Sequence, residues 1–142
     1  MKGVFAIKRS IFLFLLFPLG LLAQNSLSVE VLGVKNSEGK ISVAIYDSSD
    51  SFLKFDKVFK TDSTKAKSGS TKIFIGDLPE GNYALAIFHD ENGNDVLDTN
   101  WLGIPKEAVG FSNAKMKTFG PPSFKECLIE HHGNDELTVQ LQ

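Results

Sequence analysis

The chain has 142 residues, of which 42% are hydrophobic and 23% are charged, with five prolines and a single cysteine. This composition is typical of an ordinary globular protein and excludes a disordered or fibrous chain. Fifteen basic residues oppose seventeen acidic ones, without the basic run that binds nucleic acid, so no nucleic-acid partner is expected. One cysteine excludes an intramolecular disulfide and a cysteine-based zinc site.

The N-terminal segment, residues 1–23, is predicted to be a signal peptide. Three basic residues precede an apolar run over residues 11–22, and polarity rises abruptly after Ala23. The run is shorter than the roughly 20 residues that span a bilayer; an uncleaved anchor is the alternative. Cleavage removes three positive and no negative side chains, so the net charge falls from −2 to −5 in residues 24–142, the mature domain. We therefore expect an exported protein, periplasmic or secreted, with no transmembrane span.

The mature domain has the pattern of short strands separated by turns. Residues 27–34 and residues 40–46 both alternate apolar and polar side chains, the period of a half-buried strand. The turn-forming residues 36–39 between them predict an antiparallel hairpin. Residues 47–70 are rich in Ser, Asp and Lys, which predicts a loop with a short helical turn after Asp50 and an edge strand.

Further strands are predicted in the rest of the chain. Residues 71–75 form one, and a turn leads into residues 82–89, which are apolar on both faces and are therefore expected at the centre of a sheet. Alternation over residues 137–141 predicts a closing strand with one wet face. Cys127 is placed on another strand as a buried structural thiol.

These strands, without any sustained helical period, predict a single all-β domain over residues 24–142. The expected fold is a Greek-key β-sandwich, immunoglobulin-like or prealbumin-like. The sequence Leu-Pro-x-Gly-x-Tyr from Leu78 to Tyr83 resembles the corresponding turn of transthyretin-like and prealbumin-like modules. It marks a turn into a strand and implies no chemistry.

A polar loop over residues 90–98 has the spacing of a calcium loop. Oxygen-bearing residues occupy its first, third, fifth and ninth positions, and a backbone carbonyl fills the seventh. Compared with an EF-hand, Asp95 replaces the glycine at position six and Trp101 the glutamate at position twelve, so Glu107 or Asp77 would complete the shell. The alternative is an Asx-rich turn that needs no ion. The predicted Ca²⁺ ligands are Asp90, Asn92, Asn94, Val96 and Asp98.

Linked motifs in the second half of the chain resemble the DUF2141 family of exported bacterial proteins. The resemblance covers essentially the whole mature domain. It implies an exported β-sandwich without an established activity. The motifs are residues 89–94, Asp98, residues 103–107, residues 110–113 and residues 120–124.

Residues 99–125 show no periodicity, and a loop of this length is usually functional or packs on itself. Its aromatic residues predict a surface for an envelope or extracellular ligand, either a glycan or a protein. The alternative is that Trp101, Phe111, Phe119 and Phe124 plug the open end of the sandwich. The predicted ligand surface comprises His89, Trp101, Phe111, Ser112 and Asn113.

No catalytic residue is predicted. Ser112 lacks the final glycine and the strand-turn-helix context of a nucleophile elbow. Adjacent His131 and His132 point to opposite faces of a strand, which argues against a shared metal, and His89 is expected to bond a carboxylate. The predicted function is therefore a non-catalytic binding or structural envelope module with a calcium-stabilised loop. The alternative is a secreted hydrolase of glycans or esters whose active site is the loop over residues 89–98.

Overall fold

A computed structural model describes residues 25–142, so the predicted signal peptide lies outside the described residues. No helix in the described part of the chain is long and apolar enough to cross a membrane. In chain order, the elements are β1 (Ser26–Val34), β2 (Lys40–Tyr46), η1 (Phe55–Lys57), β3 (Lys60–Lys65), β4 (Gly69–Ile75), β5 (Gly81–Asp90), β6 (Val109–Phe111), α1 (Phe124–Cys127), β7 (Leu128–His131) and β8 (Asn134–Gln140).

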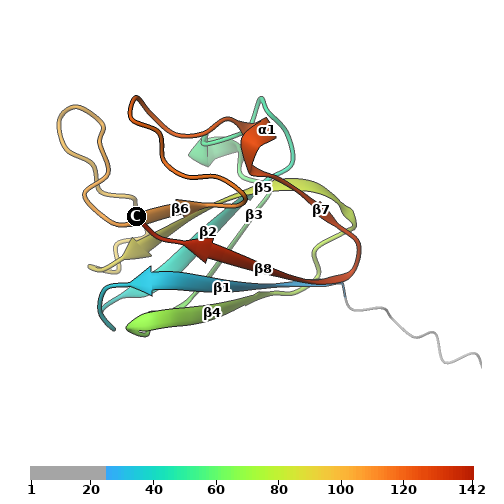
Figure 1. The fold of residues 1–142 in the computed structure, drawn as a ribbon, viewed down its shortest axis with the longest axis horizontal. Helices are drawn as coiled ribbons and strands as arrows, with labels where there is room; N and C mark the ends of the chain where they lie inside the picture. The colour runs from blue at the N-terminus through green and yellow to red at the C-terminus, as the bar shows by residue number, and fades with distance from the viewer. Residues whose placement is uncertain (1–24) are drawn as a thin grey trace, which may run out of the picture.

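Two β-sheets form the two layers of the molecule (Figure 1). The three-stranded sheet has the order β4-β1-β8, and the five-stranded sheet has the order β3-β2-β5-β6, with β7 also paired to β5. This arrangement confirms the predicted all-β sandwich. Within it, β1 pairs antiparallel with β4 and parallel with β8.

Apolar side chains from both sheets meet between the layers and form the inner cluster. Strand alternation turns every second residue of β1, β4 and β5 inward, which removes these side chains from water and stabilises the fold. Because both sheets are built wholly from residues 26–140, we expect the mature domain to fold without the preceding segment. The buried members are Leu27, Val29, Val31, Val34, Ile41, Val43, Ile45, Ala66, Ile73, Ile75, Leu78, Tyr83, Leu85, Ile87, Val139 and Leu141.

The predicted hairpin of residues 27–34 with residues 40–46 is wrong, because β1 and β2 belong to different sheets. Residues 36–39 do turn the chain, but they carry it from one sheet to the other. The crossing is tight: Gly39 has a φ of +62°, and a Cβ there would lie 1.9 Å from the carbonyl oxygen of Asp90. β2 instead pairs with β3 and β5.

The other predicted strands are present. β4, β5 and β8 contain the three strand predictions at residues 71–75, 82–89 and 137–141 almost completely. β5 lies between β2 and the pair β6 and β7, which confirms that the strand with two apolar faces is central. Within residues 47–70, η1 supplies the helical turn and β3 the edge strand.

Cys127 does not lie on a strand, contrary to the sequence prediction. It ends α1, whose first turn carries a capping box: the Ser123 backbone and hydroxyl contact the Glu126 carboxylate, each at 2.8 Å. Serine followed three residues later by glutamate is the sequence signature of a helix start. The short helix therefore interrupts the extended chain just before β7.

Candidate functional site

The outer face of the five-stranded sheet carries a second apolar layer, the outer cluster. β5 is apolar on both faces, so Ala84, Ala86 and Phe88 point away from the inner cluster. Loop residues cover this face, and Figure 1 shows the loops gathered on one side of the sandwich. The outer cluster consists of Ala84, Val109, Phe111 and Cys127, with the half-buried Phe52, Leu53, Ala86, Phe88, Leu97, Ala114, Met116 and Phe124 packed against them.

Three segments form this cover: residues 47–59, the first loop (residues 91–108) and the second loop (residues 112–123). Phe52 joins the first of these segments to the sheet and to α1. Its ring packs edge-on against Tyr46 at a centroid distance of 5.4 Å and against Phe124 at 5.9 Å. Such edge-to-face pairs add stability beyond the area that they bury.

Ser112 and Asn113 fix the start of the second loop. The Ser112 hydroxyl accepts a hydrogen bond from the Leu85 amide at 2.9 Å and donates one to the Cys127 carbonyl. Asn113 has a φ of 54° and donates from its side chain to the Leu128 carbonyl at 2.7 Å. These two members of the predicted ligand surface therefore hold the backbone at the start of the loop.

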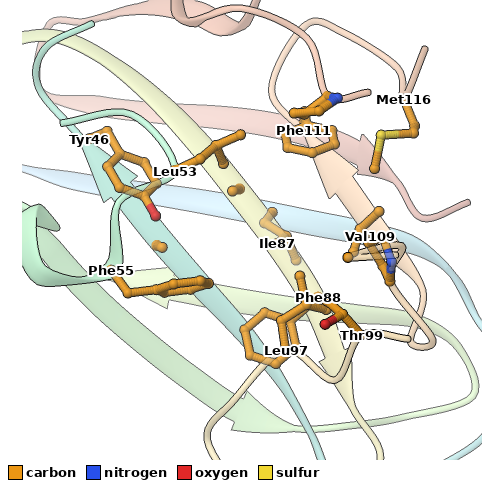
Figure 2. A pocket seen from close by; sticks show the side chains of 15 residues that line it. Tyr46, Leu53, Phe55, Ile87, Phe88, Leu97, Thr99, Val109, Phe111 and Met116 are labelled. Atoms are coloured by element: carbon orange, nitrogen blue, oxygen red, sulfur yellow. The ribbon is translucent and has the colours of Figure 1, made fainter. Parts of the chain in front are cut away.

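An apolar cavity of about 270 Å³ lies between the outer sheet face and the loops (Figure 2). Of the described residues that line it, none is charged, and only Tyr46 and Thr99 carry a side-chain hydroxyl. The lining residues are Ala44, Tyr46, Leu53, Phe55, Ala86, Ile87, Phe88, Leu97, Thr99, Gly103, Pro105, Val109, Phe111, Met116 and Pro121.

Tyr46 gives this cavity a polar group at one end. Figure 2 shows its hydroxyl directed toward the space between Leu53 and Phe55. Burial raises the pKa of the Tyr46 phenol above its ordinary value, so the hydroxyl stays protonated at neutral pH. A protonated phenol can both donate and accept a hydrogen bond.

The aromatic residues of the long loop divide into two groups. Phe111 is 7% exposed and lines the cavity, and Phe124 packs against the outer cluster. These two cover the outer face of the five-stranded sheet, not the open end of the sandwich that the plug alternative named. Trp101 and Phe119 instead are 90% and 100% exposed, so they plug nothing.

The Asp90 carboxylate organises the polar part of the first loop. Asp90 is fully buried, and its two oxygens accept hydrogen bonds from the amides of Asn94 at 3.1 Å and Asp95 at 2.8 Å. Lys40 on β2 lies 4.0 Å from the same carboxylate and contacts Asp95 as well. Asp95 has a φ of 65°, the left-handed conformation that aspartate tolerates in a tight turn.

The other predicted calcium ligands gather around Asp98. The side-chain amide of Asn92 donates to the Asp98 carboxylate at 2.7 Å, and that of Asn94 does so at 3.4 Å. Asn92 Oδ1 accepts a hydrogen bond from the backbone amide of Asn94, and Asn94 Oδ1 accepts one from the backbone amide of Val96. The loop is therefore a chain of Asx turns, in which the side-chain oxygens of Asn92, Asn94 and Asp98 already have donors.

Glu107 closes the base of the first loop. Its carboxylate accepts the amide of Glu91 and the amide of Asp98, each at 3.1 Å. Of the two residues suggested to complete a calcium shell, Glu107 is therefore next to the predicted ligands. Within residues 25–142, no group of three or more His, Cys, Asp or Glu side chains is arranged to hold a metal ion.

The histidines lie apart from the cavity. His89 is fully buried, and its Nε2 lies 2.8 Å from the carbonyl oxygen of Glu38, so it bonds a backbone carbonyl and not the expected carboxylate. His131 is buried with its Nδ1 2.7 Å from Asp135, whereas His132 is exposed, 3.4 Å from Glu130. His131 and His132 thus face different environments.

Cys127 belongs to the outer cluster. Burial, followed by the negative charge of Glu126, raises the pKa of its thiol to about 11. At neutral pH the group is an uncharged thiol, which packs as a small apolar side chain and is a poor nucleophile.

A sequence profile described as an uncharacterized protein conserved in bacteria, DUF2141, matches residues 29–140. The chain belongs to the DUF2141 family. The match spans the sandwich from β1 to the end of β8 and includes both loops over the cavity. No curated protein and no solved structure matches this DUF2141 chain.

The cavity was not foreseen from the sequence of this DUF2141 chain. Its residues come from β2, β5, β6 and all three covering segments, which lie far apart in sequence. The sequence did carry one signal for it: β5 is apolar on both faces, so its outer face must also be covered. Within the predicted ligand surface, only Phe111 lines the cavity, while His89 lies at the inner side and Trp101 in solvent.

Proposed function

We propose that this protein is an exported, non-catalytic binding module that holds a small apolar molecule, or the apolar part of a larger one, in the cavity over the five-stranded sheet. The observation that carries the proposal is the lining: apolar side chains with two hydroxyls and no charge. Binding sites for small molecules are typically concave, apolar and marked by a few polar groups that fix orientation.

The volume and chemistry of the cavity define the ligand class. About 270 Å³ is nearly twice the ~150 Å³ of an engineered apolar cavity that admits benzene. A ring system or a short acyl segment fits this space, with a hydrogen-bonding group near Tyr46 or Thr99. A glycan fits less well, because its many hydroxyls would lose water without gaining partners.

The proposal that the module is non-catalytic is supported by the state of its candidate nucleophiles and bases. Ser112 is committed to two backbone hydrogen bonds, and the Cys127 thiol is protonated. His89 is buried on the inner side of the sheet. The rival is a secreted hydrolase using residues 89–98, and turnover of any ester or glycan by the purified mature domain, lost in Asp98→Ala, would favour it.

Binding can be tested with N-phenyl-1-naphthylamine, an uncharged fluorophore that brightens in apolar surroundings. We expect saturable binding to the mature domain. Ala86→Phe would fill the cavity from β5 and weaken affinity by about tenfold or more, because a displaced ring loses its whole contact surface.

Thr138→Phe is the matched control, since it adds the same ring to an exposed position of β8 on the other sheet. It should leave affinity unchanged. Both variants should keep the wild-type melting transition. Equal affinity in Ala86→Phe and Thr138→Phe, or no saturable binding by the wild type, would contradict the proposal.

Export and calcium binding are part of the same proposal. Export rests on the predicted signal peptide, and intact mass of the protein from its native host should give a mature chain that starts at Gln24. For calcium, the support is the convergence of Asn92, Asn94 and Asp98 with Glu107 beside them. Turning the two amides would direct their oxygens toward a cation bound at Asp98, which suits a weak site.

A further inference from the structure

The tips of the two long loops expose large apolar side chains. Trp101 is 90%, Leu102 60%, Ile104 54% and Phe119 100% exposed. Single exposed apolar residues are ordinary, but four large ones on two neighbouring tips are not.

The tip of the first loop is a hydrogen-bonded turn. Thr99 pairs with Pro105, the Asn100 amide donates to the Ile104 carbonyl at 2.9 Å, and the Gly103 amide donates to Asn100 at 2.9 Å. Asn100 Oδ1 accepts the amides of Leu102 and Ile104. Most amides of the turn thus have partners inside it, which lowers the cost of moving the tip out of water.

The second tip has a related construction. The Lys117 amide donates to the Gly120 carbonyl at 3.0 Å, which closes a turn with Phe119 at its apex. The two tips are neighbours, because Gly103 of the first loop and Pro121 of the second line the same cavity. Figure 1 shows both loops extending to the same side of the sandwich.

The net charge of the segment around the tips is positive, whereas that of the rest of the mature domain is negative. Residues 99–126 carry four lysines and two glutamates, whereas the remainder of residues 24–142 carries eight lysines and fifteen acidic residues. The two glutamates are engaged: Glu107 by backbone amides, and Glu126 by Lys117 and the start of α1. Lys106 and Lys115 are exposed beside the apolar tips.

We propose that the two tips dock the domain on an anionic lipid surface, with Trp101, Leu102, Ile104 and Phe119 in the headgroup region and Lys106 and Lys115 against lipid phosphates. Tryptophan prefers the interface between headgroups and acyl chains, and lysines beside it add attraction to anionic lipid. The docking is peripheral and does not depend on whether the cavity holds a ligand.

Trp101 is the single tryptophan of the chain, so its fluorescence reports on the first tip alone. The mature domain is titrated with vesicles of phosphatidylcholine and phosphatidylglycerol, and with vesicles of phosphatidylcholine only. We expect co-sedimentation with the anionic vesicles and a blue shift of the Trp101 emission. Raising the salt concentration should weaken the binding.

Variants separate the apolar and the charged contributions. Trp101→Ser combined with Phe119→Ser should lower the partition coefficient by about tenfold or more, as the lost apolar area requires. Phe74→Ser, which removes an exposed ring from β4 on the other sheet, should not. Lys115→Gln should weaken binding to anionic vesicles by about fivefold, whereas Lys72→Gln on β4 should have no effect.

All of these variants replace exposed side chains, and unchanged melting curves verify that they fold. Ala86→Phe should bind vesicles like the wild type, so loss of cavity binding and loss of docking are separate results. The proposal is overturned if the domain ignores anionic vesicles, if the tip variants bind as well as the wild type, or if a blue shift arises only from self-association without lipid.

Discussion

The two apolar layers of this protein differ in how completely they are filled. The inner cluster lies between two sheets, and its members are nearly inaccessible to water. The outer cluster lies between one sheet and loops, eight of its twelve members are partly exposed, and it leaves a cavity of about 270 Å³. Strands pair along their whole length and pack closely, whereas loops touch a sheet only at separate points.

Because of this difference, we expect the inner cluster to stabilise the fold and the outer cluster to shape the candidate site. The inner cluster joins the two sheets and determines the fold. The outer cluster depends on hydrogen-bonded loops held by Asp90, Glu107 and Ser112 for its shape. Such loops can present a cavity and exposed tips without disturbing the sandwich, which is the usual division between a rigid scaffold and functional loops.

The comparison is tested most strongly by the same substitution in each layer. Leu85→Ala removes a fully buried side chain of the inner cluster and should lower the free energy of unfolding by roughly 2 to 5 kcal/mol. Leu97→Ala removes a half-buried side chain at the cavity and should cost roughly 1 kcal/mol, because less area returns to water.

Urea denaturation of both variants measures these values directly. Leu97→Ala should also enlarge the cavity and admit a bulkier fluorophore. Equal losses at the two positions would mean that the outer layer is as tightly packed as the inner one.

A second pair of variants concerns the loop framework. Asp90→Ala should destabilise the calcium-free domain by roughly 2 to 4 kcal/mol, because two amides lose a buried charged acceptor and Lys40 loses one of its partners. In Asp98→Ala, only the side-chain amides of Asn92 and Asn94 lose their acceptor, and the carboxylate that is removed is half-buried. This variant should therefore cost about 1 kcal/mol. The measurement is chemical denaturation in chelator, and a larger loss for Asp98→Ala would reverse this assignment.

The sequence predicted the strands better than their partners. Alternation predicted β8, and apolar side chains on both faces predicted the central β5, because both patterns record which side chains are buried. It could not show that residues 36–39 connect two sheets, since a turn sequence is the same whether the next strand pairs or crosses over. The structure shows the crossing, because β1 and β2 lie in different sheets and Gly39 closely approaches the Asp90 carbonyl between them.

The candidate site was predicted only in part, for a related reason. The polar loop over residues 90–98 is local, and its Asx turns follow from Asp and Asn at short spacing. The cavity requires Tyr46, Ala86 and Met116 to meet, and no local pattern records that contact. The exposure of Trp101 also could not be read from composition, because an aromatic residue in a loop is equally compatible with a buried plug.

Calcium provides a smaller test, confined to the first loop. We expect a dissociation constant of about 0.1 to 1 mM, as in extracellular modules, and calcium at ten times that constant should add about 1.4 kcal/mol to the stability of the mature domain. Magnesium should add less. Asp98→Ala should abolish the calcium increment. Thermal melting and calorimetric titration of metal-stripped protein test this, and an unchanged melting temperature would leave the loop a set of Asx turns.

The smallest expected effect concerns the end of the second loop, where α1 begins. The hydrogen bond from Lys117 at 2.7 Å, helped by the amide and hydroxyl of Ser123, lowers the pKa of Glu126 from its ordinary value of 4.5 to about 2. A carboxylate with a lowered folded pKa stabilises the protein fully above its unfolded pKa, and this contribution disappears as the pH falls through the folded value.

Glu126→Gln keeps a side chain that can cap the helix but removes the charge that Lys117 contacts. Its deficit relative to the wild type should therefore be constant above about pH 5 and shrink between pH 4.5 and pH 2. Because the pair is exposed, salt should shrink the deficit at neutral pH as well. Lys125→Gln, an exposed neighbour on the same helix, is the control and should show neither dependence. A deficit that grows on acidification would mean that Glu126 is stabilised in its protonated form and that the loop is held by hydrogen bonds alone.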